Sequence, residues 1–368
     1  MKYRLGDSLY IKGRIGWKGL KRKEYLDKGD YRIINGTNII NGKINWSGCG
    51  FISKERYNES PEIMLKPNDI LITKDGTIGK VAMVEELSKP STVASGIFIL
   101  RNTSPNTWIT KYLYYYLQSY DFKAFIHSRI EGSVIPHLYQ KDFESLSIKN
   151  PSLEEQNTIS RRLELIDKKI DLNNQINDNL ISLATALFNK YFPNINSGNE
   201  MIGNFISNYD RLRKPLSKKE RLSIPGKYRY IGATSVNDYI NKYNFDGIYL
   251  LLGEDGTVED ATGYPILQYI SGKFWPNNHA HVLQGKNVST EWLYLFFKQR
   301  KITSIVTGAV QKKISQKNLN SLSISIPDKD KLARFDTIIN PIFKNIRIIE
   351  SENHSLEKIK IELLSKLF

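Results

Sequence analysis

The chain has 368 residues, 40% of them hydrophobic and 11% aromatic, which is enough for two or three domains with packed cores. Its 53 lysines and arginines outnumber its 38 aspartates and glutamates, giving a formal net charge of +15. This charge points to a polyanionic partner such as nucleic acid, although AT-rich coding DNA would also make a chain rich in lysine, asparagine and isoleucine. The single cysteine, Cys49, excludes a disulfide framework and is expected to be buried. No signal peptide or membrane-spanning run is recognisable, so we expect a cytoplasmic protein.

Residues 1–150 are predicted to form a first globular unit with a mixed sheet and few helices. An aromatic-rich segment, 109–119, predicts one helix. Asp75-Gly76 is typical of a hairpin turn between two of the strands. Short apolar runs bounded by turn residues predict strands at 31–34, 69–73, 80–84 and 96–100.

Residues 151–193 predict a single long helix. Pro151 and Ser152 mark its start, Glu155 completes a capping box with Ser152, and Pro193 marks its end. At about 1.5 Å per residue such a helix is roughly 57 Å long. Its apolar stripe is narrow and therefore favours pairing with another helix. The predicted seam consists of Ile159, Leu163, Ile166, Ile170, Ile176, Leu180, Leu183 and Leu187.

Residues 194–326 repeat the plan of the first unit, and residues 327–368 predict a second long helix. The second unit has predicted strands at 248–252 and 280–283, a turn at Asp255-Gly256 and a helix at 290–298. The predicted seam of the second long helix consists of Leu332, Phe335, Ile339, Ile342, Ile346, Ile349, Leu356, Ile359 and Leu363.

Each long helix has one asparagine in its seam, Asn173 and Asn353, beside a three-residue step. That step predicts a shift in the phase of the seam, and Pro341 predicts a local kink. Antiparallel pairing of the two helices would bring the asparagines together and fix their register. The alternative, two helices packed on separate domains, stays open at this point.

Five pairs of segments show that the chain is a tandem repeat. They occur in the same order in both halves: LGDS and IGNF, YRII and YRYI, KDGTIG and EDGTVE, TKYLYYYL and TEWLYLFF, QKDFESLSI and QKNLNSLSI. The repeat is too long for a solenoid unit. The sequence therefore predicts an α+β protein of two mixed α/β domains joined by two long antiparallel coiled-coil helices, with pseudo-two-fold symmetry.

Basic segments occur at the same place in both copies, before the Tyr-Arg strand. Phosphate contacts need charge rather than one fixed side chain, so we expect these segments to contact DNA, although solvated loops remain the alternative. The candidates are Lys12, Arg14, Lys18, Lys21, Arg22 and Lys23 in the first copy and Arg211, Arg213, Lys214, Lys218, Lys219 and Arg221 in the second.

A second pair of matched segments precedes the QK…SLSI motif. Polar side chains of this kind contact base edges in DNA grooves, so we expect the two segments to read bases. The candidates are Arg129, His137, Gln140 and Lys141 in the first copy and Gln311, Lys312, Lys313 and Lys317 in the second.

No catalytic constellation is recognisable in the sequence. The segment Gly76–Lys80 lacks the spacing of a phosphate-binding loop, and a turn is the better interpretation. His279 and His281 would lie on the same face of one strand, but the sequence shows no further ligands nearby that would complete a zinc site. Asn340-Pro-Ile-Phe343 and Asp167-Lys-Lys169 only approximate methyltransferase and nuclease motifs, and both lie within predicted helices.

The duplicated unit, each copy followed by a long helix, resembles the specificity (S) subunit of type I restriction–modification systems. The resemblance covers essentially the whole chain and is carried by SLSIKNPSLEEQNTISRRLELIDKKI and SLSISIPDKDKLARFDTIINPIF. The second copy departs from the pattern, with Lys331-Leu332 in place of Glu155-Gln156.

The resemblance implies a non-catalytic subunit that recognises double-stranded DNA. Each globular unit would be a target recognition domain that reads one half of a bipartite site, while the helices set the spacing. Two methyltransferase subunits would bind S-adenosylmethionine, and restriction subunits would use ATP and Mg²⁺. The implied docking residues for the methyltransferases are Arg161, Arg162, Lys168, Lys169, Lys344 and Arg347.

Two other classes of protein remain possible from the sequence. One is a methyltransferase or nuclease fused to its own recognition domain, which would need a catalytic motif that the sequence does not show. The other is a non-catalytic coiled-coil adaptor that does not bind DNA. Salt-dependent DNA binding distinguishes the adaptor from a specificity subunit.

Overall fold

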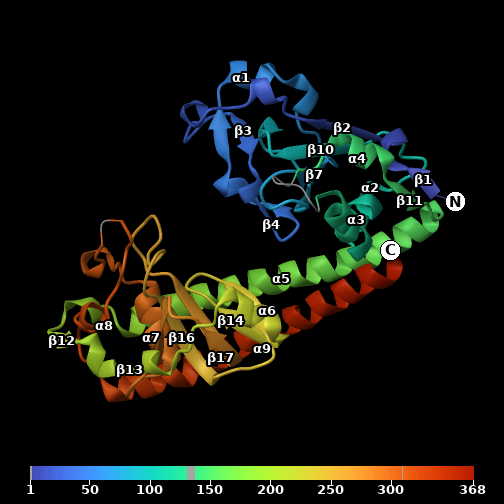
Figure 1. Ribbon diagram of the computed structural model, residues 1–368. Coiled ribbons are helices and arrows are strands. Elements are labelled where there is room, and N and C mark those ends of the chain that lie inside the picture. Colours follow the sequence, from blue (N-terminus) through green and yellow to red (C-terminus); the bar gives the residue numbers. More distant parts are fainter. Residues whose placement is uncertain (1, 131–136, 309) are drawn as a thin grey trace. The chain divides into compact units, whose positions relative to one another are not determined.

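The computed structural model describes residues 2–130, 137–308 and 310–368. The chain divides into two compact units, residues 1–171 with 354–368, and residues 172–353. Figure 1 shows two long helices, α5 (Leu153–Tyr191) and α9 (Lys329–Leu367), each of which contributes to both units. Each unit therefore consists of a globular part and one portion of each long helix.

The first unit contains two sheets. The larger one is antiparallel, with the strand order β2-β10-β7-β8, and the smaller one has the order β6-β3-β9, in which β3 and β9 are parallel. The strands are β1 (Lys2–Arg4), β2 (Leu9–Gly13), β3 (Tyr31–Ile34), β4 (Ile39–Ile40), β5 (Lys43–Ile44), β6 (Gly50–Ile52), β7 (Ile70–Thr73), β8 (Val81–Met83), β9 (Ser91–Val93), β10 (Ile97–Asn102) and β11 (Ser147–Lys149).

Side chains on the two faces of the larger sheet contribute to two separate cores in the first unit. Ile70 and Ile72 face the helices, whereas Leu71 between them packs toward the smaller sheet. The short helices of this unit are α1 (Lys54–Asn58), α2 (Thr110–Tyr116), α3 (Tyr120–Ile130) and α4 (Gln140–Ser145). Helix α3 was not predicted, and the helix expected at 109–119 ends earlier.

The second unit has one six-stranded sheet, ordered β13-β18-β16-β17-β14-β15. Its helices are α6 (Lys218–Ser223), α7 (Thr290–Lys298) and α8 (Gln316–Asn320). Its strands are β12 (Glu200–Met201), β13 (Ile206–Asn208), β14 (Pro225–Ile231), β15 (Val236–Ile240), β16 (Phe245–Gly253), β17 (Leu267–Pro276), β18 (Ala280–Gly285) and β19 (Ser323–Ile324).

The two units share one topology, which supports the predicted duplication. Strands β13-β18-β16-β17 follow the order of β2-β10-β7-β8. The long strand β17 pairs with β16 as β8 pairs with β7, and it pairs in parallel with β14 as β9 pairs with β3. The single strand β17 therefore corresponds to both β8 and β9 of the first unit. Each unit is further closed by a short strand pair before its long helix, β1 with β11 and β12 with β19.

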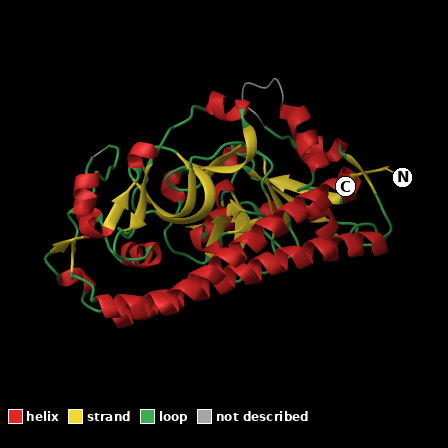
Figure 2. Cartoon of the chain, turned by 90° about the horizontal axis from the view of Figure 1, so that it is seen from below, coloured by secondary structure: helices red, strands yellow, loops and turns green. Residues whose placement is uncertain are grey.

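Within each unit, α5 and α9 pack together in opposite directions (Figure 2). In the first unit, Leu163 near the start of α5 shares a core with Leu364 near the end of α9. In the second unit, Phe188 near the end of α5 meets Phe335 near the start of α9, with ring centroids 5.8 Å apart. The predicted antiparallel pairing is therefore confirmed.

The predicted asparagine pair is also present. The Asn173 side-chain amide is buried and donates to Oδ1 of Asn353 at 2.8 Å and to Oε2 of Glu352 at 2.8 Å. The capping box at the start of α5 forms as expected, with Ser152 Oγ accepting from the Glu155 amide at 3.2 Å.

The predicted phase shift beside Asn173 was wrong. Ile176 and Leu183 are 38% and 50% exposed, whereas Ala184 and Phe188 are buried, because the seam of α5 keeps regular steps of three and four residues after Asn173. In α9, Ile359 is 48% exposed, and the neighbouring Lys360 fills the seam instead. Its ammonium donates to Asp167 Oδ1 at 2.6 Å.

Two smaller predictions can also be compared with the structure. Cys49 is buried, as expected. Strands β7 and β8 pair as a hairpin, but residues 74–80 form a longer loop than the predicted two-residue turn, with Gly76 at a φ of 65°. Among the described residues, no helix is both long and apolar enough to cross a membrane.

Candidate nucleic-acid interface

The first basic segment follows β2 and forms an exposed turn. Lys21, Arg22 and Lys23 are exposed, and Glu24 Oε2 accepts from the Lys21 amide at 2.7 Å. Arg56 of α1 holds the preceding backbone, because its guanidinium donates to the carbonyl of Lys18 at 3.2 Å. The turn therefore presents three cationic side chains from a backbone that is fixed on both sides.

The other basic residues of this segment are used inside the unit. Arg14 is buried, and its guanidinium donates to the Val93 carbonyl at 3.1 Å and to Ser60 Oγ at 3.4 Å. Burial lowers the pKa of Arg14. Lys18 Nζ donates to the Glu59 carbonyl at 2.6 Å, and Lys12 lies over the Tyr10 ring. Arg14 cannot reach a phosphate from this position, and we leave it out of the proposed interface.

The second predicted segment of the first unit is only partly described, since residues 131–136 lie outside the described residues. His137 Nδ1 contacts Asp75 Oδ1, and the Leu138 amide donates to the Lys74 carbonyl at 3.2 Å. Arg129 is exposed over the Phe125 ring, and Lys141 is exposed over the Tyr139 ring. The contact with Asp75 attaches this segment to the turn between β7 and β8.

The basic segment of the second unit contains exposed and internal residues in the same way. Arg221 donates to Asp238 Oδ2 at 2.6 Å and to the Leu216 carbonyl at 2.7 Å, and it lies over the Tyr230 ring, so it holds α6 against the sheet. The exposed residues of this segment are Arg211, Lys214, Lys218 and Lys219.

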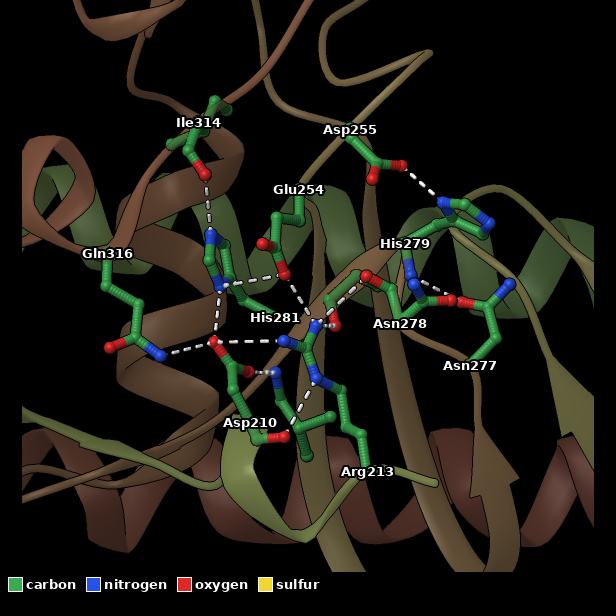
Figure 3. A network of polar contacts seen from close by, with 12 residues as sticks. Asp210, Arg213, Glu254, Asp255, Asn277, Asn278, His279, His281, Ile314 and Gln316 are labelled. Atoms are coloured by element: carbon green, nitrogen blue, oxygen red, sulfur yellow. Dashed lines mark hydrogen bonds and ion pairs between the residues drawn. The ribbon is translucent and has the colours of Figure 1, made fainter. Parts of the chain in front are cut away.

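Arg213 is at the centre of a polar network (Figure 3). Its Nη1 donates to Glu254 Oε2 at 2.6 Å and to the Ala280 carbonyl at 2.6 Å. Its Nε donates to the carbonyl of Asp210 at 3.0 Å. The side chain was predicted to contact DNA, but it instead joins three loops at one end of the sheet.

His281 is the buried part of the same network, with 1% of its surface exposed. Its Nδ1 lies 2.6 Å from Asp210 Oδ2, and its Nε2 lies 2.9 Å from the carbonyl of Ile314. Burial alone would raise the pKa of Asp210, but hydrogen bonds from His281, Gln316 and the Val282 amide lower it to about 2. Asp210 is therefore ionised in the folded protein, and both ring nitrogens of His281 face acceptor oxygens.

Asp210, Glu254 and His281 place possible ligand atoms within 4.8 Å of one another. Both nitrogens of His281 already lie within hydrogen-bond distance of protein oxygens, Oδ2 of Asp210 and the carbonyl of Ile314. The guanidinium of Arg213 already supplies positive charge to the two carboxylates. His279 does not join them, because its Nδ1 contacts Asp255. In the structure these side chains and Arg213 form one network of ion pairs and hydrogen bonds.

Residues 310–313 adjoin this network. Lys312 Nζ donates to Glu259 Oε1 at 2.7 Å, and Lys313 Nζ lies 3.7 Å from Glu254 Oε1. Both lysine side chains remain 54% exposed, and Gln311 is exposed beside them. Gln316, which follows this loop in α8, donates to Asp210 Oδ2 at 2.7 Å.

The predicted docking residues on the long helices differ in their surroundings. Arg161, Arg162, Lys169 and Lys344 are exposed. Lys168 Nζ lies 2.8 Å from Glu164 Oε1 on the same helix. Arg347 is used internally, because its Nη1 donates to the Tyr269 hydroxyl at 2.5 Å and to Glu291 Oε1 at 3.2 Å.

Sequence reasoning missed Asp210, Glu254 and Gln316 as parts of one network. Glu254 and Gln316 stand in the repeated motifs EDGTVE and QKNLNSLSI, which were used only to align the copies. The available signal was that charged residues beside buried strand ends need partners inside the protein. The pairing itself depends on long-range strand register, which one sequence does not reveal.

Comparison with known proteins identifies the family. The family model described as "Type I restriction modification DNA specificity domain" matches residues 1–181 and again residues 206–361. The MjaIX specificity subunit of Methanocaldococcus jannaschii is 23% identical and aligns with 94% of this chain and 88% of its own length. The MjaVIII specificity subunit of the same organism is 26% identical over 42% of this chain and 37% of its own length.

A solved structure has the same fold. The S subunit of a type I restriction–modification system from M. genitalium superposes with a TM-score of 0.53 at 17% identity, covering 100% of this chain and 96% of that chain. The two successive matches of the family model correspond to the two copies of the repeat. The chain belongs to the family of type I restriction–modification DNA specificity subunits.

Proposed function

We propose that each unit of this specificity subunit reads one half of a bipartite target in double-stranded DNA. Membership in the family supports a DNA specificity role without catalysis of its own, with S-adenosylmethionine and ATP belonging to the methyltransferase and restriction subunits. The observation that carries the finer proposal is the shared topology, which puts an exposed basic loop after the first strand of the large sheet in both units.

The phosphate contacts of the proposal are the exposed residues of the two basic loops. The proposal omits the internal residues Arg14, Arg213 and Arg221. Candidate base contacts are Arg129, His137 and Lys141 in one unit and Gln311, Lys312 and Lys313 in the other. Phosphate contacts position the protein, whereas groups at the base edges supply the sequence preference.

The experiment measures DNA affinity against salt concentration for the full chain and for two triple variants. Neutralising Lys21, Arg22 and Lys23 to Gln should lower the slope of log affinity against log salt by about 0.9 for each side chain that binds a phosphate, on every duplex alike. The variant of Arg211, Lys214 and Lys218 should behave in the same way. The matched control is Arg161→Gln on α5. Unchanged slopes in both triple variants would remove these loops from the interface.

We also propose that α5 and α9 set the spacing of the two half-sites and dock two methyltransferase subunits. The support is the exposed charge on α5, at Arg161, Arg162 and Lys169, beside a seam that is one stripe wide. Reversing the charge of Arg162 and Lys169 should impair co-purification of the methyltransferase more than DNA binding. Restriction subunits, their Mg²⁺ and a cytoplasmic location remain predictions.

A spacing role for the helices is tested by an insertion. Four residues added near Asn173 lengthen α5 by about 6 Å, and DNA rises about 3.4 Å per base pair. Methylation mapping should then show a gap between the half-sites that is wider by about one or two base pairs. An active variant with an unchanged gap would contradict a measuring role.

A further inference from the structure

The two units share a pair of tyrosine rings at the same strand position. In the first unit, the ring centroid of Tyr31 in β3 lies 4.8 Å from that of Tyr57 in α1. In the second unit, Tyr228 in β14 lies 4.9 Å from Tyr243, which stands in the loop between β15 and β16. All four rings retain exposed surface, and Tyr243 is 41% exposed.

Strand register shows that the two pairs are equivalent. The residue after the first tyrosine is an arginine in each unit, and both arginines lie in a parallel strand pair, opposite Ser91 and Phe274. The Arg32 guanidinium donates to Ser88 Oγ at 2.8 Å, and that of Arg229 donates to the Ser271 carbonyl at 2.7 Å. Ser88 precedes Ser91 by the same number of residues as Ser271 precedes Phe274. The tyrosine, the arginine and the hydrogen bond of the arginine are therefore repeated in both units.

Each pair adjoins the basic loop of its own unit. Arg56, next to Tyr57 in sequence, donates to the carbonyls of Lys18 and Gly19 at 3.2 and 3.1 Å. Asn244, next to Tyr243, donates to the carbonyl of Leu212 at 3.1 Å. In both units, a neighbour of the second tyrosine therefore holds the backbone of the loop that carries the exposed cations.

The second unit adds positive charge directly at the pair. Lys273 is exposed, and its ammonium lies 4.6 Å from the centroid of the Tyr243 ring. Lys227 lies 5.5 Å from the centroid of the Tyr228 ring. Hydroxyls and ammonium groups side by side are the groups with which proteins contact phosphate and sugar oxygens.

We propose that the pairs Tyr31–Tyr57 and Tyr228–Tyr243 are sequence-independent contacts to the DNA sugar–phosphate backbone, one in each unit. The proposal rests on the function proposed above. If the two units read different half-sites, a feature that is the same in both cannot carry the difference in sequence. What it can supply in both units is a fixed position on the backbone, next to the basic loop.

The test uses the full chain and two duplexes of equal length and unrelated sequence. The double variant Tyr57→Phe/Tyr243→Phe removes one hydroxyl from each pair and keeps the rings. Its affinity should fall about fivefold for each hydroxyl that contacts the backbone, by the same factor on both duplexes. Tyr120→Phe, at a residue that is 70% exposed on α3, is the matched control and should bind like the parent.

Lys273→Gln gives a second measurement that does not depend on the rings. It should lower the slope of log affinity against log salt by about 0.9, whereas Lys190→Gln, at an exposed lysine of α5, should not. Parental affinity and slope in both the tyrosine and the Lys273 variants would overturn the inference, as would a loss confined to one duplex. If the parent itself shows no salt-dependent binding, the proposed function fails as well.

Discussion

The two units differ most clearly at one position of their shared sheet. In the first unit, Phe98 of β10 lies opposite Ile72 of β7 and opposite Gly13 at the end of β2. In the second unit, His281 of β18 takes the place of Phe98, opposite Leu252 of β16, and Asp210 follows β13 where Gly13 ends β2. A ring packed on a glycine therefore corresponds to a buried histidine within hydrogen-bond distance of a carboxylate.

The turn beside this position also differs in the charge of its first residue. Lys74 begins the KDG turn of the first unit, and its ammonium lies 5.3 Å from the centroid of the Phe98 ring. Glu254 begins the EDG turn of the second unit and accepts from Arg213. The duplicated sheet is therefore a constant frame, whereas the groups that join its loops differ: a lysine over an aromatic ring in the first unit, and Glu254 paired with Arg213 in the second.

The largest effect is expected from Asp210→Ala. This change leaves His281 buried without its nearest acceptor, and the guanidinium of Arg213 then faces only the Glu254 carboxylate, which costs about 3–5 kcal/mol of unfolding free energy. Denaturant unfolding of the full chain measures it, with the exposed Asp246→Ala as the control. A loss below about 1 kcal/mol would show that the network contributes little to the stability of the second unit.

The frame and the network were not equally predictable from the sequence. Short apolar runs such as Ile70-Leu71-Ile72 predicted strands, and the repeat predicted two similar units, because these signals are local or internal to the chain. The network was not predictable, since Asp210 is 71 positions from His281 and 106 positions from Gln316 in the sequence. Among the basic candidates, charge alone did not separate exposed Arg211 from internal Arg213.

The pH dependence that Asp210 gives to the stability of the second unit is the next largest effect. The pKa of Asp210 falls from its ordinary 3.8 to about 2 in the folded protein. A lowered pKa stabilises the folded state fully above the unfolded value, and the stability is lost as pH falls through the folded value. Between about pH 4 and pH 2 the parent should therefore lose about 2 kcal/mol that Asp210→Asn does not lose.

The difference between the parent and Asp210→Asn isolates this carboxyl from the other acids of the chain. Unfolding curves at a series of pH values measure it. The first unit has Gly13 at the corresponding place, so Gly13→Ala should leave the pH dependence of stability unchanged. Parallel curves for the parent and Asp210→Asn would show that the carboxyl is not protected in the folded protein.

Overpacking should affect the first unit by a smaller amount. A Cβ atom on Gly13 would lie 2.9 Å from Cδ1 of Phe98 and 3.1 Å from the Ile97 carbonyl oxygen. Gly13→Ala should therefore cost about 1–3 kcal/mol of unfolding free energy. In a Phe98→Leu background the added cost should be smaller, because the ring is gone. An equal cost in both backgrounds would place the strain at the backbone rather than at the ring.

The smallest effect is expected from Lys74→Met in the turn of the first unit, which is compared with Glu254→Gln in the turn of the second. Lys74→Met keeps the aliphatic packing against Phe98 and removes the ammonium over the ring, so it should cost about 0.5–1 kcal/mol of unfolding free energy. Glu254→Gln should cost more, because Arg213 and His281 then lose one of the two carboxylates that face them, Asp210 and Glu254. Denaturant unfolding of both variants under the same conditions ranks the two turns. Equal costs would mean that the charge at this turn contributes no more to the second unit than the cation over the ring contributes to the first.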